Sequence, residues 1–317
     1  MLPLEHKILR ALRAREASGR PILVAVSGGV DSMVCLSILV RLRPLLKNEI
    51  FVIHVHHGRK NAFRDQALRL VRKTADGLGV AFYGKTYRGK KALHSEAELR
   101  QFRWRAIREI QKVIHNSLGA EKDVLIATGH NADDLLETRL LRLLRGTGLR
   151  GMPAMDPSIL RPLLETTRDE ILEYAHAIGL HWVEDPSNRD LDPRRNWLRH
   201  VWLPQLKQKW PSANRTLARS LDIIAAEWSR ASERRRTTTK GLLSGQKRIS
   251  RPKFLALSRD EKTACLADYL LLMGVREFTH GQILEILRQL DKARRHYKFT
   301  AVRTEWMVTP REIRAKI

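Results

Sequence analysis

The chain has 317 residues, of which 43% are hydrophobic, so it can form one or two domains with sizeable cores. No apolar run approaches the ~18 residues of a transmembrane helix, and the first residues lack a signal-peptide pattern. The two cysteines, Cys35 and Cys265, belong to no CxxC pair, which argues against a disulfide framework or a structural zinc site. We therefore expect a cytoplasmic protein without membrane contact.

Positive charge dominates the sequence. The net charge is +25, and such a field attracts polyanions such as nucleic acids. Residues 211–317 carry a net charge of +12, and residues 1–210, which are about twice as many, carry +13. The C-terminal third is thus the denser in charge and the better candidate for a nucleic-acid surface. A basic but merely solvated surface is the alternative.

Strands and helices alternate in the first two thirds of the chain. Short apolar runs predict strands near residues 22–26, 50–55, 80–83, 124–128 and 159–163, with helical patterns between them. Two capping boxes, Ser95 with Glu98 and Thr167 with Glu170, mark helix starts. This alternation predicts an α/β fold with a doubly wound, mainly parallel sheet of about five strands.

A glycine-rich loop, SGGVDS, joins the first predicted strand to its helix. Glycines let the backbone curl so that N–H groups turn outward, and the helix dipole adds partial positive charge. The loop has Asp31 and no lysine, so it is not a Walker loop, and a carboxylate beside a phosphate implies an intervening Mg²⁺. An ordinary strand-to-helix turn is the alternative. The predicted phosphate-binding residues are Ser27, Gly28, Gly29, Val30, Asp31 and Ser32.

Two further strand ends carry polar side chains. The second strand ends in HVHHG, which we interpret as a loop close to the ligand, because nothing nearby completes a metal site. The fourth is followed by His130, Asp133, Asp134 and Glu137. Asp133 and Glu137 share a helix face at i, i+4. Capping alone explains one aspartate at a helix start, but the whole set predicts a functional site.

The pattern changes after residue 211. Long helical patterns and a possible hairpin at residues 298–302 and 305–308 predict a second, basic and mainly helical domain over residues 212–317. Residues 234–240, RRRTTTK, are typical of a hinge or exposed loop. The densest basic patch lies at residues 292–298 and includes Arg294 and Arg295.

The loop SGGVDS resembles the pyrophosphate-binding loop of the ATP pyrophosphatases, which have an adenine nucleotide α-hydrolase-like fold. HVHHG, then Glu96, Arg100, Arg103 and Trp104 on one helix, then GHNADDLLET, RPLL, EDPSN and RRNWLR follow in the order seen in tRNA(Ile)-lysidine synthetases. The resemblance covers residues 20–210. It implies a PP-loop catalytic domain over residues 1–211 and a tRNA-binding domain over residues 212–317.

The resemblance implies the reaction. Members of that family use ATP to join L-lysine to C2 of the wobble cytidine of tRNA(Ile) with a CAU anticodon, through an adenylated base, releasing AMP and pyrophosphate. The tRNA then changes identity from methionine to isoleucine and reads AUA. The chain departs from the common pattern at Leu135 and Leu136 within GHNADDLLET, and we expect it to lack the third domain found in longer relatives. No obligate protein partner is implied.

The resemblance also assigns roles to residues. The ATP loop is Ser27–Ser32, and Mg²⁺ would be held by Asp31, Asp133 and Asp134. The catalytic candidates are Asp31, Arg100, His130, Asp133 and Glu137. The weaker candidates for tRNA or substrate contact are Glu96, Arg103, Arg195, Asn196 and Arg199, to which the basic patch, apart from the resemblance, adds Arg294 and Arg295.

Two other functions fit parts of the sequence. Another PP-loop tRNA-modifying enzyme, a thiolase, needs cysteines placed for persulfide or iron–sulfur chemistry, and Cys35 and Cys265 are better interpreted as small core residues. A non-catalytic RNA-binding module is of a different class, and the complete set of carboxylates argues against it. Release of pyrophosphate from ATP distinguishes the two classes.

Overall fold

The computed structural model describes residues 1–58, 62–89, 95–119, 123–145, 156, 158–186, 190, 194–244, 248–275, 278–292 and 295–316, with the backbone alone for Glu96, residues 232–240 and Ser244. The chain divides into two compact units. Residues 1–141 with 154–218 form the N-terminal unit, and residues 142–153 with 219–317 form the C-terminal unit. The division falls at Ala218, inside a helix, whereas the sequence pattern changes at residue 211.

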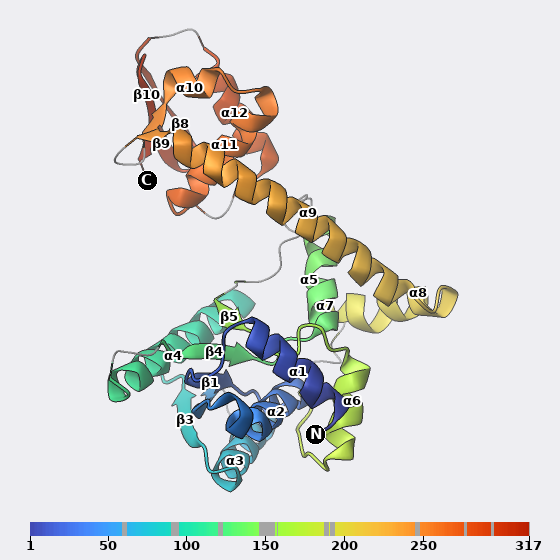
Figure 1. Ribbon diagram of the computed structural model, residues 1–317. Coiled ribbons are helices and arrows are strands. Elements are labelled where there is room, and N and C mark those ends of the chain that lie inside the picture. Colours follow the sequence, from blue (N-terminus) through green and yellow to red (C-terminus); the bar gives the residue numbers. More distant parts are fainter. Residues whose placement is uncertain are drawn as a thin grey trace. The chain divides into compact units, whose positions relative to one another are not determined.

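Five parallel strands form the sheet of the N-terminal unit, in the order β3-β2-β1-β4-β5 (Figure 1). This confirms the predicted α/β fold with a doubly wound sheet of about five strands. The strands are β1 (Ile22–Ala25), β2 (Ile50–His56), β3 (Ala81–Thr86), β4 (Leu125–Thr128) and β5 (Ile159–Leu160). The helices are α1 (Pro3–Ala14), α2 (Val30–Leu46), α3 (Ala62–Gly77), α4 (Glu96–Ser117), α5 (Ala132–Leu144), α6 (Arg168–Ala177), α7 (Arg194–Trp197), the π-helical η3 (Leu198–Trp202) and α8 (Leu203–Lys209).

Apolar side chains cover both faces of this sheet. Ile22 and Val24 of β1 lie in a core with α1, α2, α3 and α6, whereas Leu23 lies in a second core with α4. All three are 0% exposed. Successive residues of a strand point to opposite faces, so a strand buried on both sides is apolar throughout, as ILVA is. Figure 1 shows α4 on the side of the sheet away from α2 and α3.

The strand order reverses between β1 and β4. From β1 the chain moves outward to β2 and β3, and from β4 it moves the other way to β5. In an open α/β sheet, a ligand binds beyond the carboxyl ends of the strands at this switch point. The SGGVDS loop follows β1 and the residues Gly129–Asp134 follow β4, so the fold brings the two predicted polar segments to that edge.

Gly129 lets the two segments touch. A Cβ atom at this residue would lie 2.8 Å from the backbone C and O of Asp31 and from the backbone N of Ser32. We predict that Gly129→Ala destabilises the N-terminal unit by about 1–3 kcal/mol, the usual cost of overpacking against backbone that cannot move aside. Gly77→Ala is the control, because nothing lies within 4 Å of its Cβ position. Urea denaturation measures both, and equal midpoints for the two variants would contradict this packing.

The C-terminal unit combines helices with a second sheet. Its helices are α9 (Ala213–Leu242), which begins in the N-terminal unit, α10 (Arg251–Leu255), α11 (Arg259–Leu272) and α12 (His280–Leu290). Five antiparallel strands run in the order β6-β7-β10-β9-β8. They are β6 (Leu243–Ser244), β7 (Arg248–Ser250), β8 (Tyr297–Ala301), β9 (Thr304–Val308) and β10 (Glu312–Lys316). The predicted hairpin is confirmed as β8 and β9, while β6, β7 and β10 were not predicted.

Aromatic side chains fill the core of the C-terminal unit. Trp306 is 0% exposed and stacks on Phe299 with 5.8 Å between ring centroids and 6° between planes. Its other neighbour is Tyr269 of α11, at 5.8 Å, whose hydroxyl accepts a hydrogen bond from the backbone N–H of Ala315 at 3.0 Å. These contacts fasten the helices to the sheet and give this unit a core of its own.

The prediction of a hinge or loop at residues 234–240 is wrong. The structure continues α9 through them to Leu242. Consecutive threonines weaken a helix by only a few tenths of a kcal/mol each, roughly, which does not interrupt a helix 30 residues long. Across the described residues, neither α9 nor any other helix has the length and apolarity needed to cross a membrane.

Candidate active site

The loop between β1 and α2 is held in shape by its own serines. Ser32 Oγ donates to the backbone O of Gly29 at 2.8 Å and accepts from the N–H of Ser27 at 3.1 Å. Gly28 has a φ of +94°, in the left-handed region that favours glycine. A Cβ on Gly28 would lie 3.0 Å from Cβ of Ala67. Val30 begins α2 and is buried, so the backbone of the loop is fixed at a helix N-terminus, the arrangement that binds anions.

Asn131, which the sequence analysis did not single out, connects this loop to α5. Its Nδ2 donates to Asp31 Oδ1 at 3.1 Å, and the side chain is 3% exposed. Asn131 also forms a reciprocal cap with Asp134: the N–H of Asp134 donates to Asn131 Oδ1 at 2.9 Å, and the N–H of Asn131 donates to Asp134 Oδ2 at 3.2 Å. The spacing of Asn131 and Asp134 was a visible capping signal.

Arg168, the first residue of α6, is the other residue that the sequence analysis missed. Its guanidinium donates from Nη1 to Asp31 Oδ2, and its backbone N–H donates to Asp133 Oδ2 at 2.7 Å. Arg168 therefore contacts the first turns of both α2 and α5. The side chains of Asp31 and Arg168 are 28% and 40% exposed, so this part of the site opens to solvent.

Glu137 lies deeper and is bound by arginines. Arg199 donates from Nε to Glu137 Oε1 at 2.6 Å and from Nη2 to Oε2 at 2.9 Å, and Glu137 is 1% exposed. Arg199 Nη2 also donates to Asp134 Oδ1 at 2.9 Å. Arg195 donates to Thr138 Oγ1 at 2.6 Å, and its Nε lies 3.5 Å from Glu137 Oε2. The carboxylate of Glu137 therefore holds arginines and is closed to a substrate amine.

Burial and ion pairing have opposite effects on the pKa values of Glu137 and Arg199. Burial raises the pKa of Glu137, although its bonds with Arg199 act the other way. Burial alone would lower the pKa of Arg199, but the bonds to Glu137 and Asp134 raise it above its ordinary value. Arg199 stays charged at every working pH, so Glu137 with Arg199 is a charged, bidentate pair.

His130 is neutral at pH 7. Burial lowers its pKa; the charge of Asp134 opposes this, while Arg161, Arg195 and Arg100 add to it. Its Nδ1 lies 2.8 Å from Thr128 Oγ1 at the end of β4. Arg100 is exposed on α4, and its charge is one of those that lower the pKa of His130.

The HVHHG segment contributes a second neutral imidazole. Burial, together with the charges of Arg103 and Arg64, lowers the pKa of His57 to about 4. Arg103 Nη2 lies 3.3 Å from His57 Nε2, and Phe102 packs edge-on against the His57 ring at 6.3 Å between centroids. These contacts join the segment after β2 to α4, the helix that carries Arg100 and Arg103.

The predicted metal-binding trio is not brought together as one set of ligands. Among the described residues, no group of three or more His, Cys, Asp and Glu side chains could hold a metal ion. Both oxygens of Asp134 are bound, to Asn131 and Arg199. Asp31 and Asp133 both contact Arg168, Asp31 through the guanidinium and Asp133 through the backbone N–H. They fit Mg²⁺, which binds proteins through one or two carboxylates and takes its other ligands from substrate phosphates and water.

Several predicted residues lie elsewhere. Asn196 donates to the backbone O of Asp190 at 2.7 Å, within its own segment. Glu96 begins α4, but its side chain is outside the described residues, as is all of Arg294. Arg295 is exposed in the C-terminal unit. The last two residues of EDPSN, at 187–188, also lie outside the described residues.

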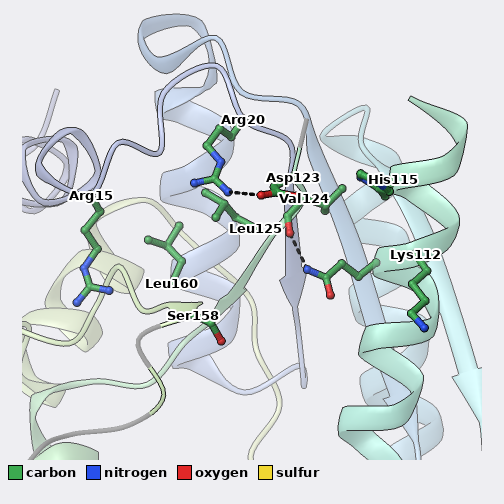
Figure 2. Close-up of a pocket in the computed structure, with 10 residues that line it drawn as sticks. Arg15, Arg20, Lys112, His115, Asp123, Val124, Leu125, Ser158 and Leu160 are labelled. Atoms are coloured by element: carbon green, nitrogen blue, oxygen red, sulfur yellow. Dashed lines mark hydrogen bonds and ion pairs between the residues drawn. The ribbon is translucent and has the colours of Figure 1, made fainter. Parts of the chain in front are cut away.

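A hollow of about 710 Å³ lies at the opposite end of the sheet (Figure 2). Arg15, Arg20, Asp123, Val124 and Ser158 are among the residues lining it, and an ion pair joins Arg20 to Asp123 at 4.0 Å. Arg15 and Arg20 precede β1, Asp123 and Val124 precede β4, and Ser158 precedes β5. They therefore mark the amino ends of the strands, away from the switch point where ligands bind in this type of sheet.

Comparisons with known proteins agree with the fold. A PP-loop domain family matches residues 2–206. In the solved structure of a U34-tRNA thiolase, NcsA from Methanococcus maripaludis, a similar fold covers 70% of this chain and 78% of that one, with a TM-score of 0.55 and 17% identity. The sheet and its phosphate loop thus define a PP-loop protein, a class that uses ATP.

Two curated relatives identify the family within this class to which the chain belongs. The tRNA(Ile)-lysidine synthase of Bdellovibrio bacteriovorus is 35% identical to this chain, over 99% of the chain and 97% of the relative. That of Edwardsiella ictaluri is 32% identical over 90% of the chain and 65% of the relative. The chain belongs to the tRNA(Ile)-lysidine synthase family of enzymes.

Proposed function

We propose that this enzyme joins L-lysine to C2 of the wobble cytidine of a tRNA(Ile) with a CAU anticodon and splits ATP to AMP and pyrophosphate. Family membership supports the tRNA, and the contact between the loops after β1 and β4 supports the chemistry. That contact, the bond from Asn131 to Asp31, joins the SGGVDS loop to the acidic start of α5, and this arrangement supports ATP binding at the loop. Because the proposed substrate is a tRNA, we place the reaction in the cytoplasm.

In the first step, the C2 oxygen of cytidine attacks the α-phosphorus of ATP, giving an O-adenylated base and pyrophosphate. The backbone N–H groups of the SGGVDS loop hold the pyrophosphate as its charge increases. Asp31 and Asp133 would hold Mg²⁺, which supplies positive charge to the phosphates. Arg100, exposed near His130, is free to contact the base or a phosphate, and neutral His130 adds no charge to the site.

In the second step, the ε-amine of lysine attacks C2, a proton leaves the nitrogen, and AMP departs with the C2 oxygen. Free lysine has a side-chain pKa of about 10.4, so the amine needs a proton acceptor. We assign this role to half-buried Asp133, because Glu137 is enclosed by arginines. Glu137 positions Arg199, and through it Asp134.

The partial reactions test this order of steps. With tRNA present and lysine absent, the enzyme is expected to exchange labelled pyrophosphate into ATP, because the base is adenylated first. Omitting tRNA is expected to stop the exchange. Exchange that requires lysine and proceeds without tRNA would indicate a lysyl adenylate and overturn the proposal.

The basic C-terminal unit supplies the charge for tRNA binding. We predict that changing Arg294 and Arg295 together to glutamine weakens tRNA binding and lowers the slope of affinity against salt by about 1–2, roughly one for each lost phosphate contact. Filter binding from low to moderate salt measures the slope, with Arg259→Gln in the same unit as the control. An unchanged slope would exclude this pair from the phosphate contacts.

A thiolase is the second candidate, and the fold shared with NcsA is compatible with it. The sulfur chemistry of such an enzyme needs reactive cysteines. Both cysteines of this chain are buried, and burial raises the pKa of Cys35 to about 12. These properties favour lysine ligation over thiolation.

A further inference from the structure

Arg168 lies where a cation is needed. Its guanidinium binds Asp31 and its backbone N–H binds Asp133, the two carboxylates that fit Mg²⁺. The backbone is fixed, because Thr167 and Glu170 close a capping box at the start of α6. Only the side chain of Arg168 can move without disturbing the fold, and it extends to the first turn of the helix that follows the phosphate loop.

The two partners of this ion pair differ in how firmly they are held. Asp31 is anchored by buried Asn131, which donates to its other oxygen at 3.1 Å. The side chain of Arg168 is 40% exposed, and its guanidinium donates to Asp31. A pair this exposed contributes little stability, so separating it costs little. Arg168 is therefore the partner that can turn to a new anion.

ATP brings such an anion. Its phosphates would lie on the loop next to Asp31, where two negative groups repel each other unless cations separate them. A guanidinium binds phosphate oxygens in a fork of two hydrogen bonds and stays charged at any working pH. A divalent cation that arrives with the nucleotide can neutralise the carboxylate of Asp31 in place of Arg168.

We propose that Arg168 neutralises Asp31 in the free enzyme and moves to the β- and γ-phosphates when ATP binds with Mg²⁺, so that it holds the pyrophosphate that the first step releases. This inference rests on the proposed function, because it takes the SGGVDS loop as the site of the pyrophosphate. It adds to that function a phosphate-binding residue and a reason for the ion pair between α2 and α6.

The test compares nucleotides with and without the pyrophosphate group. Isothermal titration calorimetry with Mg²⁺ measures binding of α,β-methylene ATP, which is not cleaved, and of AMP. Arg168→Gln is expected to weaken the analogue by about tenfold or more, the loss of one charged hydrogen bond. Binding of AMP is expected to change less than about twofold, since AMP lacks the phosphates in question. Arg168→Lys is expected to recover part of the affinity.

Arg13→Gln is the matched control, because Arg13 is an exposed arginine of α1 in the same unit. If the role of Arg168 is purely structural, Arg168→Gln should lose equal affinity for both nucleotides and have a lower melting temperature. Equal losses of affinity, or an unchanged affinity for the analogue, would overturn the inference. If the parent enzyme binds the analogue and exchanges pyrophosphate, such a result removes only the role of Arg168. If the parent enzyme does neither, the proposed function itself fails.

Discussion

Replacing Arg199 with methionine is expected to destabilise the N-terminal unit by about 3–5 kcal/mol, the cost of leaving a buried charge without its partner. Glu137 is 1% exposed, and Arg199 binds both of its carboxylate oxygens. Arg195, at 3.5 Å from Oε2, is too distant to replace those two bonds. Arg199 was predicted as a weaker candidate for tRNA or substrate contact, and its bonds show that it also helps to hold the site together.

A double-mutant cycle separates this ion pair from the rest of the site. Glu137→Gln with Arg199→Met removes both charges and is expected to recover much of the stability that the single Arg199→Met change loses, because no unpaired charge remains. Lysine ligation is expected to stay lost in the double variant, since Asp134 no longer has Arg199 to hold it. Urea denaturation measures the cycle. A single Arg199→Met variant as stable as the parent would refute the account of this pair.

Replacing Asp133 with asparagine is expected to lower lysine transfer by about 10²–10⁴-fold, the usual contribution of a positioned proton acceptor. Asparagine keeps an oxygen that can accept the N–H of Arg168, so the start of α6 and the fold are preserved. The neutral asparagine side chain cannot accept a proton from the amine, and it carries no charge to neutralise a cation. Binding of tRNA, which depends on the basic surface, is expected to stay within about twofold.

Asp169→Asn is the matched control for Asp133→Asn. Asp169 is the next residue of α6 after Arg168, and its side chain is 86% exposed. This variant is expected to transfer lysine like the parent enzyme. Near-normal turnover by Asp133→Asn would remove Asp133 from the chemistry. A parallel loss of tRNA binding would show instead that the change acts on substrate binding.

Local patterns were enough to predict the edge of the sheet where the site lies. The apolar run ILVA and the glycines after it predict a strand followed by a phosphate loop, and the strand order confirms that the loops after β1 and β4 meet. The capping boxes at Ser95 and Thr167 are also confirmed, because a cap depends on residues only three positions apart.

Contacts between distant residues could not be predicted in this way. Arg168 and Asp31 are 137 residues apart, and nothing near either one in the sequence indicates the other. Arg199 and Glu137 are 62 residues apart, so the sequence predicted Arg199 as a candidate for tRNA or substrate contact but did not indicate its bonds to a buried carboxylate. Strands β6 and β7 have two and three residues, too few for an alternating pattern to be visible.

The central claim is that this enzyme ligates lysine to one particular tRNA, and transfer of labelled lysine tests it most directly. Purified enzyme, ATP and Mg²⁺ are incubated with an unmodified tRNA(Ile) transcript bearing CAU, and a tRNA(Met) with the same anticodon serves as control. We expect labelled lysine in the isoleucine tRNA alone, with one AMP formed for each lysine joined. Absence of label from both tRNAs, in an enzyme that is folded and binds ATP, would contradict the assigned reaction.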